Sequence, residues 1–189
     1  MTKTELRLCF KKARQDFVLS SNNESICSCK QTLSEHILNA DIINGTIGGY
    51  AAMTSELDPS KLIEICRERG HRIALPYFEN RDSAMRYRQW DDASFEHGPF
   101  GIRQPTTKCK TIEPDTLLIP LVAVDLKGNR LGQGQGHYDR ILARFRAERP
   151  ITAIGVAWTC QIADRIPVDP WDEPLDYIAT PDRIIKVKS

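Results

Sequence analysis

The sequence lacks three features that would each indicate a particular class of protein: a long hydrophobic run, an excess of one charge and a secretory leader. No apolar stretch reaches the roughly 18 residues that a membrane-spanning helix needs, and residues 1–5 are not apolar enough for a signal peptide. The 26 basic and 25 acidic side chains leave a formal net charge of +1, whereas nucleic-acid binding needs a basic excess gathered on one face. We therefore expect a cytoplasmic protein without a membrane or nucleic-acid partner.

The patterns of structural metal sites are missing as well. None of the six cysteines forms a Cys-x-x-Cys motif, and Cys27 and Cys29 are too close together for an ordinary zinc knuckle. Only four histidines are present, and they do not have paired ligand spacing. We therefore expect no structural zinc, and reduced thiols in a reducing compartment.

The sequence does contain enough apolar material for one packed domain. With 189 residues and 41% hydrophobic side chains, the chain falls in the ordinary range for a single domain, which we place at residues 1–189. Apolar periodicity predicts helices at residues 2–19, 25–40, 59–69 and 137–148. Apolar runs with β-branched residues predict strands at residues 46–53, 72–77, 116–125, 151–158 and 177–187.

The order of these elements indicates the fold class. Two N-terminal helices precede an alternation of strands and helices, which is typical of an α/β fold. We expect a single three-layer domain with a mostly parallel central sheet and helices on both faces. Residues 78–115 differ, because they are polar, contain three prolines and show little periodicity. A stretch of that length inside a compact domain is usually functional or mobile.

The most informative segment is a glycine-spaced loop between the long apolar strand and the last predicted helix. Gly132, Gly134 and Gly136 alternate there, and glycine lets backbone amides approach a ligand without an intervening Cβ. The helix that follows directs unpaired N–H groups at the same place, so the loop could hold phosphate, with Arg130 adding charge-assisted bonds. Neither a Walker A motif nor Gly-x-Gly-x-x-Gly is present, and a tight structural turn would show similar glycine spacing.

The residues around these glycines resemble a known family. The loop reads Arg130-Leu131-Gly132-x-Gly134-x-Gly136-x-Tyr138-Asp139-Arg140, and this pattern resembles the hallmark of the 5-formyltetrahydrofolate cyclo-ligase family, also called methenyltetrahydrofolate synthetases. Four further segments are similar to the family, in its order and over almost the whole chain: Lys3 to Arg7, Glu56-Leu57-Asp58, Gly101-Ile102-Arg103-Gln104-Pro105 and Asp172-Glu173-Pro174-Leu175-Asp176-Tyr177-Ile178. Gln104, Gln135 and His137 depart from the residues that are common in the family.

The resemblance implies an ATP-dependent enzyme of folate metabolism. The reaction would convert 5-formyltetrahydrofolate and ATP to 5,10-methenyltetrahydrofolate, ADP and phosphate, with Mg²⁺ as cofactor. The γ-phosphoryl group would go to the formyl oxygen, and N10 would attack the resulting iminium phosphate. Phosphoryl transfer demands positioning and charge neutralisation more than covalent help from the protein. The two small molecules are the expected partners, and we expect a monomer.

The resemblance also implies roles for individual residues. We expect Arg130 and Tyr138 to be catalytic, and Asp139 and Asp176 to ligate Mg²⁺, which prefers carboxylate oxygen. The implied ATP-binding residues are Lys3, Thr4, Glu5, Leu6, Arg7, Arg130, Leu131, Gly132, Gln133, Gly134, Gln135, Gly136, His137 and Tyr138. The implied substrate-binding residues are Met53, Asp58, Met85, Phe100 and Tyr138, with Tyr87 as a further candidate for an apolar wall.

Simpler interpretations stay open at this point. Lys3 and Arg7 could be ordinary charges on an amphipathic helix, Asp139 a first-turn acid that complements the helix dipole, and Asp58 a helix N-cap. For the whole chain, the alternatives are a sugar-phosphate isomerase-like enzyme and a nucleotide-binding regulator without catalysis, because a fold does not settle a function. The first would need a catalytic carboxylate at a strand end, and the second would have lost residues such as Lys3 or Asp139.

Overall fold

The structure is a computed structural model that describes residues 1–91 and 95–187. A seven-stranded sheet forms its centre, with the order β12-β11-β9-β6-β1-β2-β3. Its strands are β1 (Ile47–Gly48), β2 (Ile73–Tyr77), β3 (Arg86–Trp90), β6 (Thr116–Pro120), β9 (Thr152–Val156), β11 (Tyr177–Ala179) and β12 (Ile184–Lys186). The inner strands run parallel to one another, whereas the edge strands β3 and β12 are antiparallel to their neighbours. The prediction of a mostly parallel sheet is confirmed.

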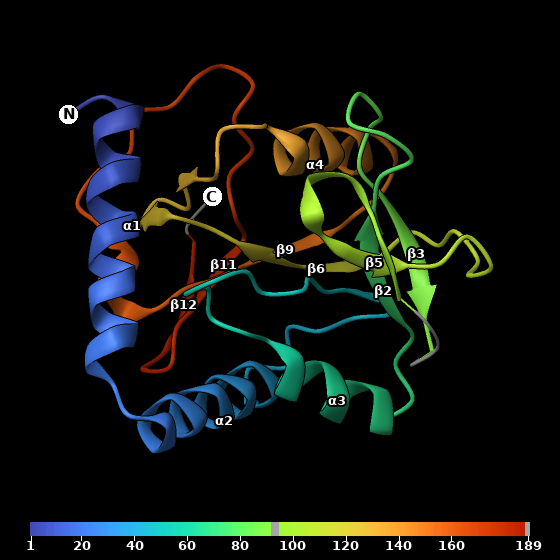
Figure 1. The fold of residues 1–189 in the computed structure, drawn as a ribbon, viewed down its shortest axis with the longest axis horizontal. Coiled ribbons are helices and arrows are strands. Elements are labelled where there is room, and N and C mark those ends of the chain that lie inside the picture. Colours follow the sequence, from blue (N-terminus) through green and yellow to red (C-terminus); the bar gives the residue numbers. More distant parts are fainter. Residues whose placement is uncertain (92–94, 188–189) are drawn as a thin grey trace.

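The α-helices cover both faces of this sheet, as the sequence predicts (Figure 1). They are α1 (Lys3–Ser20), α2 (Asn23–Asn39), α3 (Ser60–Glu68) and α4 (His137–Glu148). Figure 1 shows α2 and α3 on one face, α4 on the other, and α1 upright beside one end of the sheet. The first two helices begin at side-chain caps: the Thr2 hydroxyl accepts from the Glu5 amide in a capping box, and Asn22 caps α2.

The central strand β6 explains how the two faces are held. Its side chains alternate between two hydrophobic clusters, because successive residues of a strand point to opposite faces. Leu118 joins the cluster that contains α2 and α3, and Leu117 and Ile119 join the cluster that contains α4. All three side chains are fully buried, so each layer is anchored to this strand.

The predicted strand 116–125 is wrong in one respect, because the chain leaves the main sheet after Pro120. Residues Ala123–Asp125 form β7 of a separate small sheet, beside β8 (Arg130–Leu131) and β10 (Ile162–Ala163). The carbonyl of Leu121 accepts from the side chains of Arg14 (3.2 Å) and Gln161 (2.8 Å) instead of continuing the ladder. These polar side chains satisfy the backbone where the chain changes sheets.

The predicted irregular segment 78–115 is also more ordered than expected. It contains β3, β4 (Phe95–His97), a short 3₁₀ helix η1 (Pro99–Gly101) and β5 (Arg103–Pro105). The buried Arg88 makes β3 possible, because its guanidinium lies 3.8 Å from the centroid of the Tyr77 ring and donates to Glu96 and to the carbonyl of Pro105. The predicted strand 46–53 reduces to β1, 151–158 reduces to β9, and 177–187 is the hairpin β11–β12.

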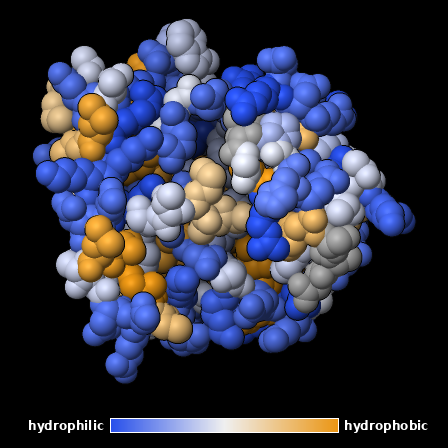
Figure 2. Space-filling view, viewed as in Figure 1, coloured by the Kyte–Doolittle hydropathy of each residue, from blue (hydrophilic) through white to orange (hydrophobic). Residues whose placement is uncertain are grey.

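The molecular surface has few large hydrophobic side chains. On the face that Figure 2 shows, hydrophilic residues predominate and hydrophobic ones are scattered. Among the residues that the structure describes, no helix has both the length and the apolar character needed to cross a membrane.

Candidate active site

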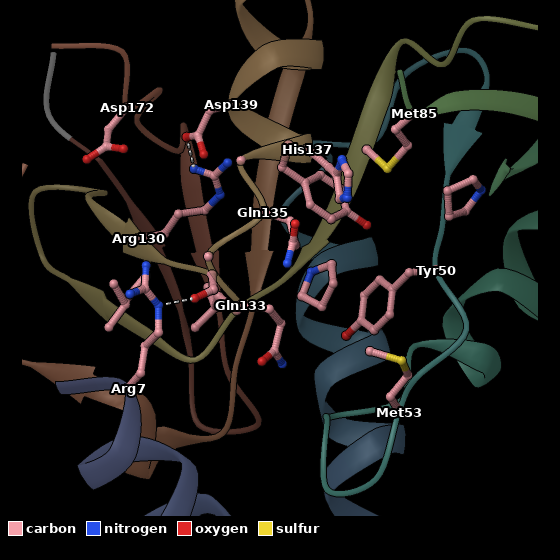
Figure 3. A pocket seen from close by; sticks show the side chains of 18 of the residues that line it. Arg7, Tyr50, Met53, Met85, Arg130, Gln133, Gln135, His137, Asp139 and Asp172 are labelled. Carbon is pink, nitrogen blue, oxygen red and sulfur yellow. Dashed lines mark hydrogen bonds and ion pairs between the residues drawn. The ribbon is translucent and has the colours of Figure 1, made fainter. Parts of the chain in front are cut away.

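A cavity of about 490 Å³ lies between the start of α1, the loop after β8 and the segments after β1 and β2. Its size lies within the roughly 300–1,000 Å³ that is usual for small-molecule sites. Figure 3 shows that the cavity has two ends of different character. Charged side chains gather at one end, and aromatic and thioether side chains gather at the other.

The glycine-spaced loop, residues 132–136, lines the charged end. Gly134 and Gly136 have φ angles of +102° and +64°, which residues with side chains rarely adopt. Gly136 is the N-cap of α4, so the first unpaired N–H groups of that helix lie at the cavity. The Nε of Arg7 donates to the carbonyl of Gly132 (2.9 Å) and thereby holds the loop against α1 (Figure 3). The loop follows the short strand β8 rather than the central strand itself, which corrects the predicted placement.

Two further cations stand at this end in different settings. The ammonium of Lys3 pairs with Asp169 (2.7 Å) and Asp172 (2.5 Å). Partial burial acts to lower the pKa of Lys3, but the hydrogen bonds and charges of the two aspartates outweigh it, so the pKa is raised. The buried Arg130 donates to Oδ1 of Asp139 at 2.8 Å. Both cations are therefore held in place by carboxylates before any ligand arrives.

Asp139, Asp169 and Asp172 line this end of the cavity, and a metal ion could use Asp139 and Asp172. Both line the cavity, and Figure 3 shows them on the same side of it. The structure does not bring Asp176 to this place, because its carboxylate pairs with Arg146 (3.2 Å) and accepts from the backbone amide of Ala153 (2.7 Å). No cluster of three or more His, Cys, Asp or Glu that could enclose a metal is found in the described part of the chain. Two carboxylates nevertheless fit Mg²⁺, which usually takes one or two and completes its shell with water and phosphate oxygens.

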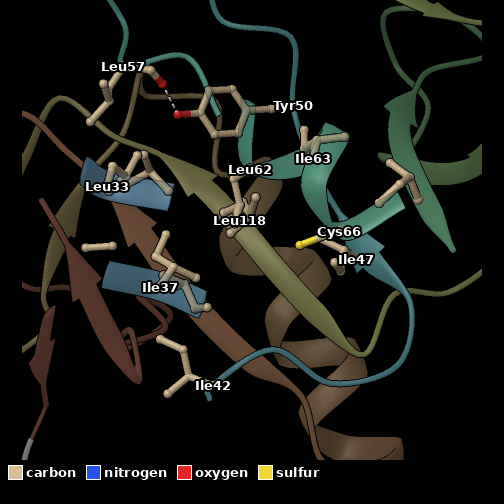
Figure 4. Packing of buried hydrophobic residues seen from close by; sticks show 14 of the residues in the cluster. Leu33, Ile37, Ile42, Ile47, Tyr50, Leu57, Leu62, Ile63, Cys66 and Leu118 are labelled. Carbon is tan, nitrogen blue, oxygen red and sulfur yellow. Dashed lines mark hydrogen bonds between the residues drawn. The ribbon is translucent and has the colours of Figure 1, made fainter. Parts of the chain in front are cut away.

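The other end of the cavity is largely apolar. It is lined by Tyr50, Met53, Phe78, Met85 and Ile102, among others. The Tyr50 hydroxyl donates to the carbonyl of Leu57 within the core cluster between α3 and the central sheet (Figure 4). Full burial, with the charge of Glu56 next in weight, raises the pKa of Tyr50 well above its usual value, so this hydroxyl keeps its proton and its anchoring bond.

Tyr138 and Glu56 also line the cavity. Burial first, and then the Glu56 carboxylate, raise the pKa of Tyr138 far above its ordinary value, so its hydroxyl is a hydrogen-bond donor at any physiological pH. The Glu56 side chain is only 6% exposed and lies 3.9 Å from the guanidinium of Arg14. One Glu56 oxygen accepts from the Met53 amide (3.0 Å), and the other lies 3.4 Å from the side-chain amide of Gln133. A carboxylate that is paired with arginine inside a cavity can bind N–H groups of a ligand while it remains charged.

The amino-acid sequence matches the 5-formyltetrahydrofolate cyclo-ligase family over residues 1–181. The chain belongs to this family. Its cyclo-ligase relatives include the 5-formyltetrahydrofolate cyclo-ligase of Haemophilus influenzae, which is 30% identical over 156 residues that cover 77% of this chain and 82% of the relative. The protein of the same name from Mycolicibacterium smegmatis is 32% identical over 147 residues, with coverages of 73% and 74%.

Solved structures agree with this cyclo-ligase assignment. The 5,10-methenyltetrahydrofolate synthetase of Aquifex aeolicus has a TM-score of 0.81 and 27% identity, and the match covers 100% of this chain and 94% of that one. The synthetase of Mycoplasma pneumoniae has a TM-score of 0.74 at 23% identity, with coverages of 96% and 99%, and it supports the fold alone.

Most of the nucleotide-site residues predicted from the cyclo-ligase resemblance lie at the cavity. Lys3, Arg7 and residues 130–138 all line it. Three neighbours in α1 are not among the described residues that line it: Thr4 is exposed, Glu5 caps the helix, and Leu6 packs in a small cluster beside β7 and β8. Nucleotide contact by these three residues therefore stays a prediction.

The predicted substrate residues divide in a similar way. Met53 and Met85 line the cavity. Asp58 does not: it accepts from the Ser60 amide (3.0 Å) at the start of α3 and pairs with Lys30. The side chain of Phe100 lies outside the described residues, and that of Tyr87 is buried in the core. Sequence reasoning missed Glu56 and Asp172 as site residues, although both belong to segments that resemble the family.

Proposed function

We propose that the chain converts 5-formyltetrahydrofolate and ATP to 5,10-methenyltetrahydrofolate, ADP and phosphate. One observation carries this proposal: a single cavity joins a glycine loop with flanking cations and carboxylates to an apolar end that contains a buried carboxylate. The charged end suits the triphosphate of ATP, and the apolar end suits the flat ring of a folate. Family membership supports the same activity.

At the charged end, the backbone amides of residues 132–137 would bind phosphate oxygens, together with Lys3, Arg7 and Arg130. Asp139 and Asp172 would hold Mg²⁺, in place of the pair Asp139 and Asp176 that the sequence suggested. The ion would supply positive charge to the β- and γ-phosphates when it is bound. Lys3 would then exchange its bond to Asp172 for one to a phosphate.

At the apolar end, Met53, Phe78 and Met85 would pack against the pterin ring. Glu56 would accept hydrogen bonds from the ring's N–H groups, because it lines the cavity, its side chain is only 6% exposed and it lies beside Arg14. This role replaces the one that the sequence suggested for Asp58, which is occupied at the start of α3. Charge-assisted bonds of this kind contribute about 1.5–3 kcal/mol each.

Arg130 and Tyr138 lie where the two substrates would meet. The Tyr138 hydroxyl would donate to the formyl oxygen and hold it in line with the γ-phosphorus. Transfer breaks the bond between that phosphorus and the β–γ bridging oxygen, and it forms a bond to the formyl oxygen. N10 then attacks the formyl carbon and loses its proton, the C–O bond breaks, and phosphate leaves with the former formyl oxygen and takes up that proton. Arg130, fixed by Asp139, would balance the charge on the phosphoryl group during transfer.

The test is a thermal-shift and turnover experiment on the purified chain. We expect MgATP and 5-formyltetrahydrofolate each to raise the melting temperature, because a ligand that binds only the folded state stabilises it. Mixing both should release methenyl product and phosphate in equal amounts. Stabilisation by ATP alone without product would favour a nucleotide-binding regulator, and stabilisation by neither would favour an isomerase-like enzyme.

The setting of the protein is part of the proposal. We propose a single catalytic domain at residues 1–189, because the residues that line the cavity range from Lys3 to Asp172, and we propose that the protein is a monomer. All six cysteines are free, which supports a reducing compartment such as the cytoplasm. Size-exclusion chromatography with light scattering would test the monomer, since a dimer mass at assay concentration would contradict it.

A further inference from the structure

Trp171 is an exposed aromatic side chain at the edge of the candidate active site. It lines the cavity, yet 70% of its surface is exposed. The other tryptophans differ, because Trp158 is fully buried and Trp90 is partly buried in the same core cluster. An indole ring has a large apolar face, and at the edge of a ligand cavity this face is available to contact a bound ligand.

Hydrogen bonds fix the backbone turn that carries Trp171. Residues 169–172 form a tight turn in which the Asp172 amide donates to the carbonyl of Asp169 (3.0 Å). The Asp169 amide donates back to the Asp172 carboxylate (2.8 Å), and Pro170 stiffens the second position of the turn. Both aspartates pair with Lys3 at the first turn of α1. The turn is thus fixed to α1 by its two end residues, and Trp171 sits between them.

The position of the turn decides which ligand Trp171 would meet. Its neighbour Asp172 lies at the charged end, away from Met53 and Met85 at the apolar end (Figure 3). The γ-phosphate of a bound ATP must face the apolar end to reach the folate, so the nucleoside would extend the other way, toward Asp172 and Trp171 (Figure 3). An aromatic ring suits a purine base, because stacking uses the π-face and needs no matched hydrogen bonds.

We propose that Trp171 is the platform on which the adenine of ATP stacks, and that the Asp169–Asp172 turn and Lys3 position it. The proposal rests on the proposed function, since it takes ATP as the nucleotide. Trp171 would contribute to nucleotide affinity and not to the chemical step. Loss of one aromatic–base stack corresponds to roughly 5- to 150-fold in affinity.

The experiment measures binding of a non-hydrolysable ATP analogue and of inorganic tripolyphosphate, each with Mg²⁺, to wild type, Trp171→Ala and Trp171→Phe. We expect Trp171→Ala to weaken the analogue about tenfold or more and to leave tripolyphosphate unchanged. Trp171→Phe should recover much of the loss, because it restores an aromatic face. The KM for 5-formyltetrahydrofolate should be the same in all three proteins.

Three results would overturn the platform. Unchanged affinity for the analogue in Trp171→Ala would show that Trp171 does not stack on the adenine. An equal loss of tripolyphosphate affinity would mean that Trp171 only supports the turn and Lys3. A selective rise in the KM of the folate would assign the ring to the other substrate. These results are independent of the proposed function. That function fails instead if wild type binds the analogue but forms no methenyl product from MgATP and 5-formyltetrahydrofolate.

Discussion

Gly132→Ala separates a ligand-binding glycine from a structural one. An added Cβ at Gly132 meets no heavy atom within 4 Å, and its φ lies outside the left-handed region. Folding should therefore tolerate the change, and a compatible Gly→Ala substitution stabilises by about 0.4–1 kcal/mol, or roughly 1–4 °C in a domain of this size. If phosphates lie against this backbone, however, the methyl group stands in their place. Losing one charge-assisted bond of about 1.5–3 kcal/mol corresponds to a roughly 10- to 150-fold weaker ATP complex.

Gly70→Ala is the matched control for this experiment. Gly70 also has open space around its Cβ position, but its φ is +88° and it follows α3, outside the residues that line the cavity. We expect Gly70→Ala to lower the melting temperature, because alanine in a left-handed conformation costs about 1 kcal/mol, while the KM for ATP stays unchanged. The two variants should thus show opposite patterns in calorimetry and kinetics. A Gly132→Ala protein with wild-type KM for ATP would refute the phosphate loop.

Three further predictions concern charged groups. Asp172→Asn should lower turnover at least about tenfold and raise the Mg²⁺ concentration for half-maximal rate, whereas Asp176→Asn should change only stability; equal Mg²⁺ titrations would contradict this. Glu56→Gln should raise the KM for 5-formyltetrahydrofolate by roughly tenfold or more with the KM for ATP unchanged, and an unchanged folate KM would remove Glu56 from the site. Burial, and then the charge of Arg140, lower the pKa of His137, so its neutral form stabilises the fold above about pH 6.5 and that contribution is lost as pH falls. The melting temperature of His137→Tyr should therefore fall less than that of wild type between pH 7.5 and 5.5. An equal fall in both proteins would refute the assignment of this pH dependence to His137.

The parts of the fold that follow from local pattern were predictable. Periodicity and composition predict the capped helices α1 and α2 and the apolar run of β6. The end of β6 could not be predicted, because the apolar run continues beyond it. The carbonyl of Leu121 accepts instead from Arg14 and Gln161, which are distant in sequence. Strand β3 was missed because Arg88 looks polar in sequence and is buried only through Tyr77 and Glu96.

The candidate site shows the same division. The spacing of the glycines in residues 132–136 depends on backbone conformation, so the loop could be read from the sequence. The sequence could not show which carboxylate faces the cavity, because Asp172 and Asp176 lie in the same short segment. Asp172 and Asp176 lie close together in the chain. Their directions are decided by tertiary contacts, because Asp172 pairs with Lys3 and Asp176 pairs with Arg146.

The proposed function depends most directly on whether one cavity brings ATP and the folate together. The decisive measurement mixes the purified chain with MgATP and 5-formyltetrahydrofolate and follows the absorbance of the methenyl product and the release of phosphate in the same reaction. We predict that both appear together, in equal amounts, and only when both substrates are present. Phosphate release without methenyl product, or no reaction at all, would contradict the proposed function.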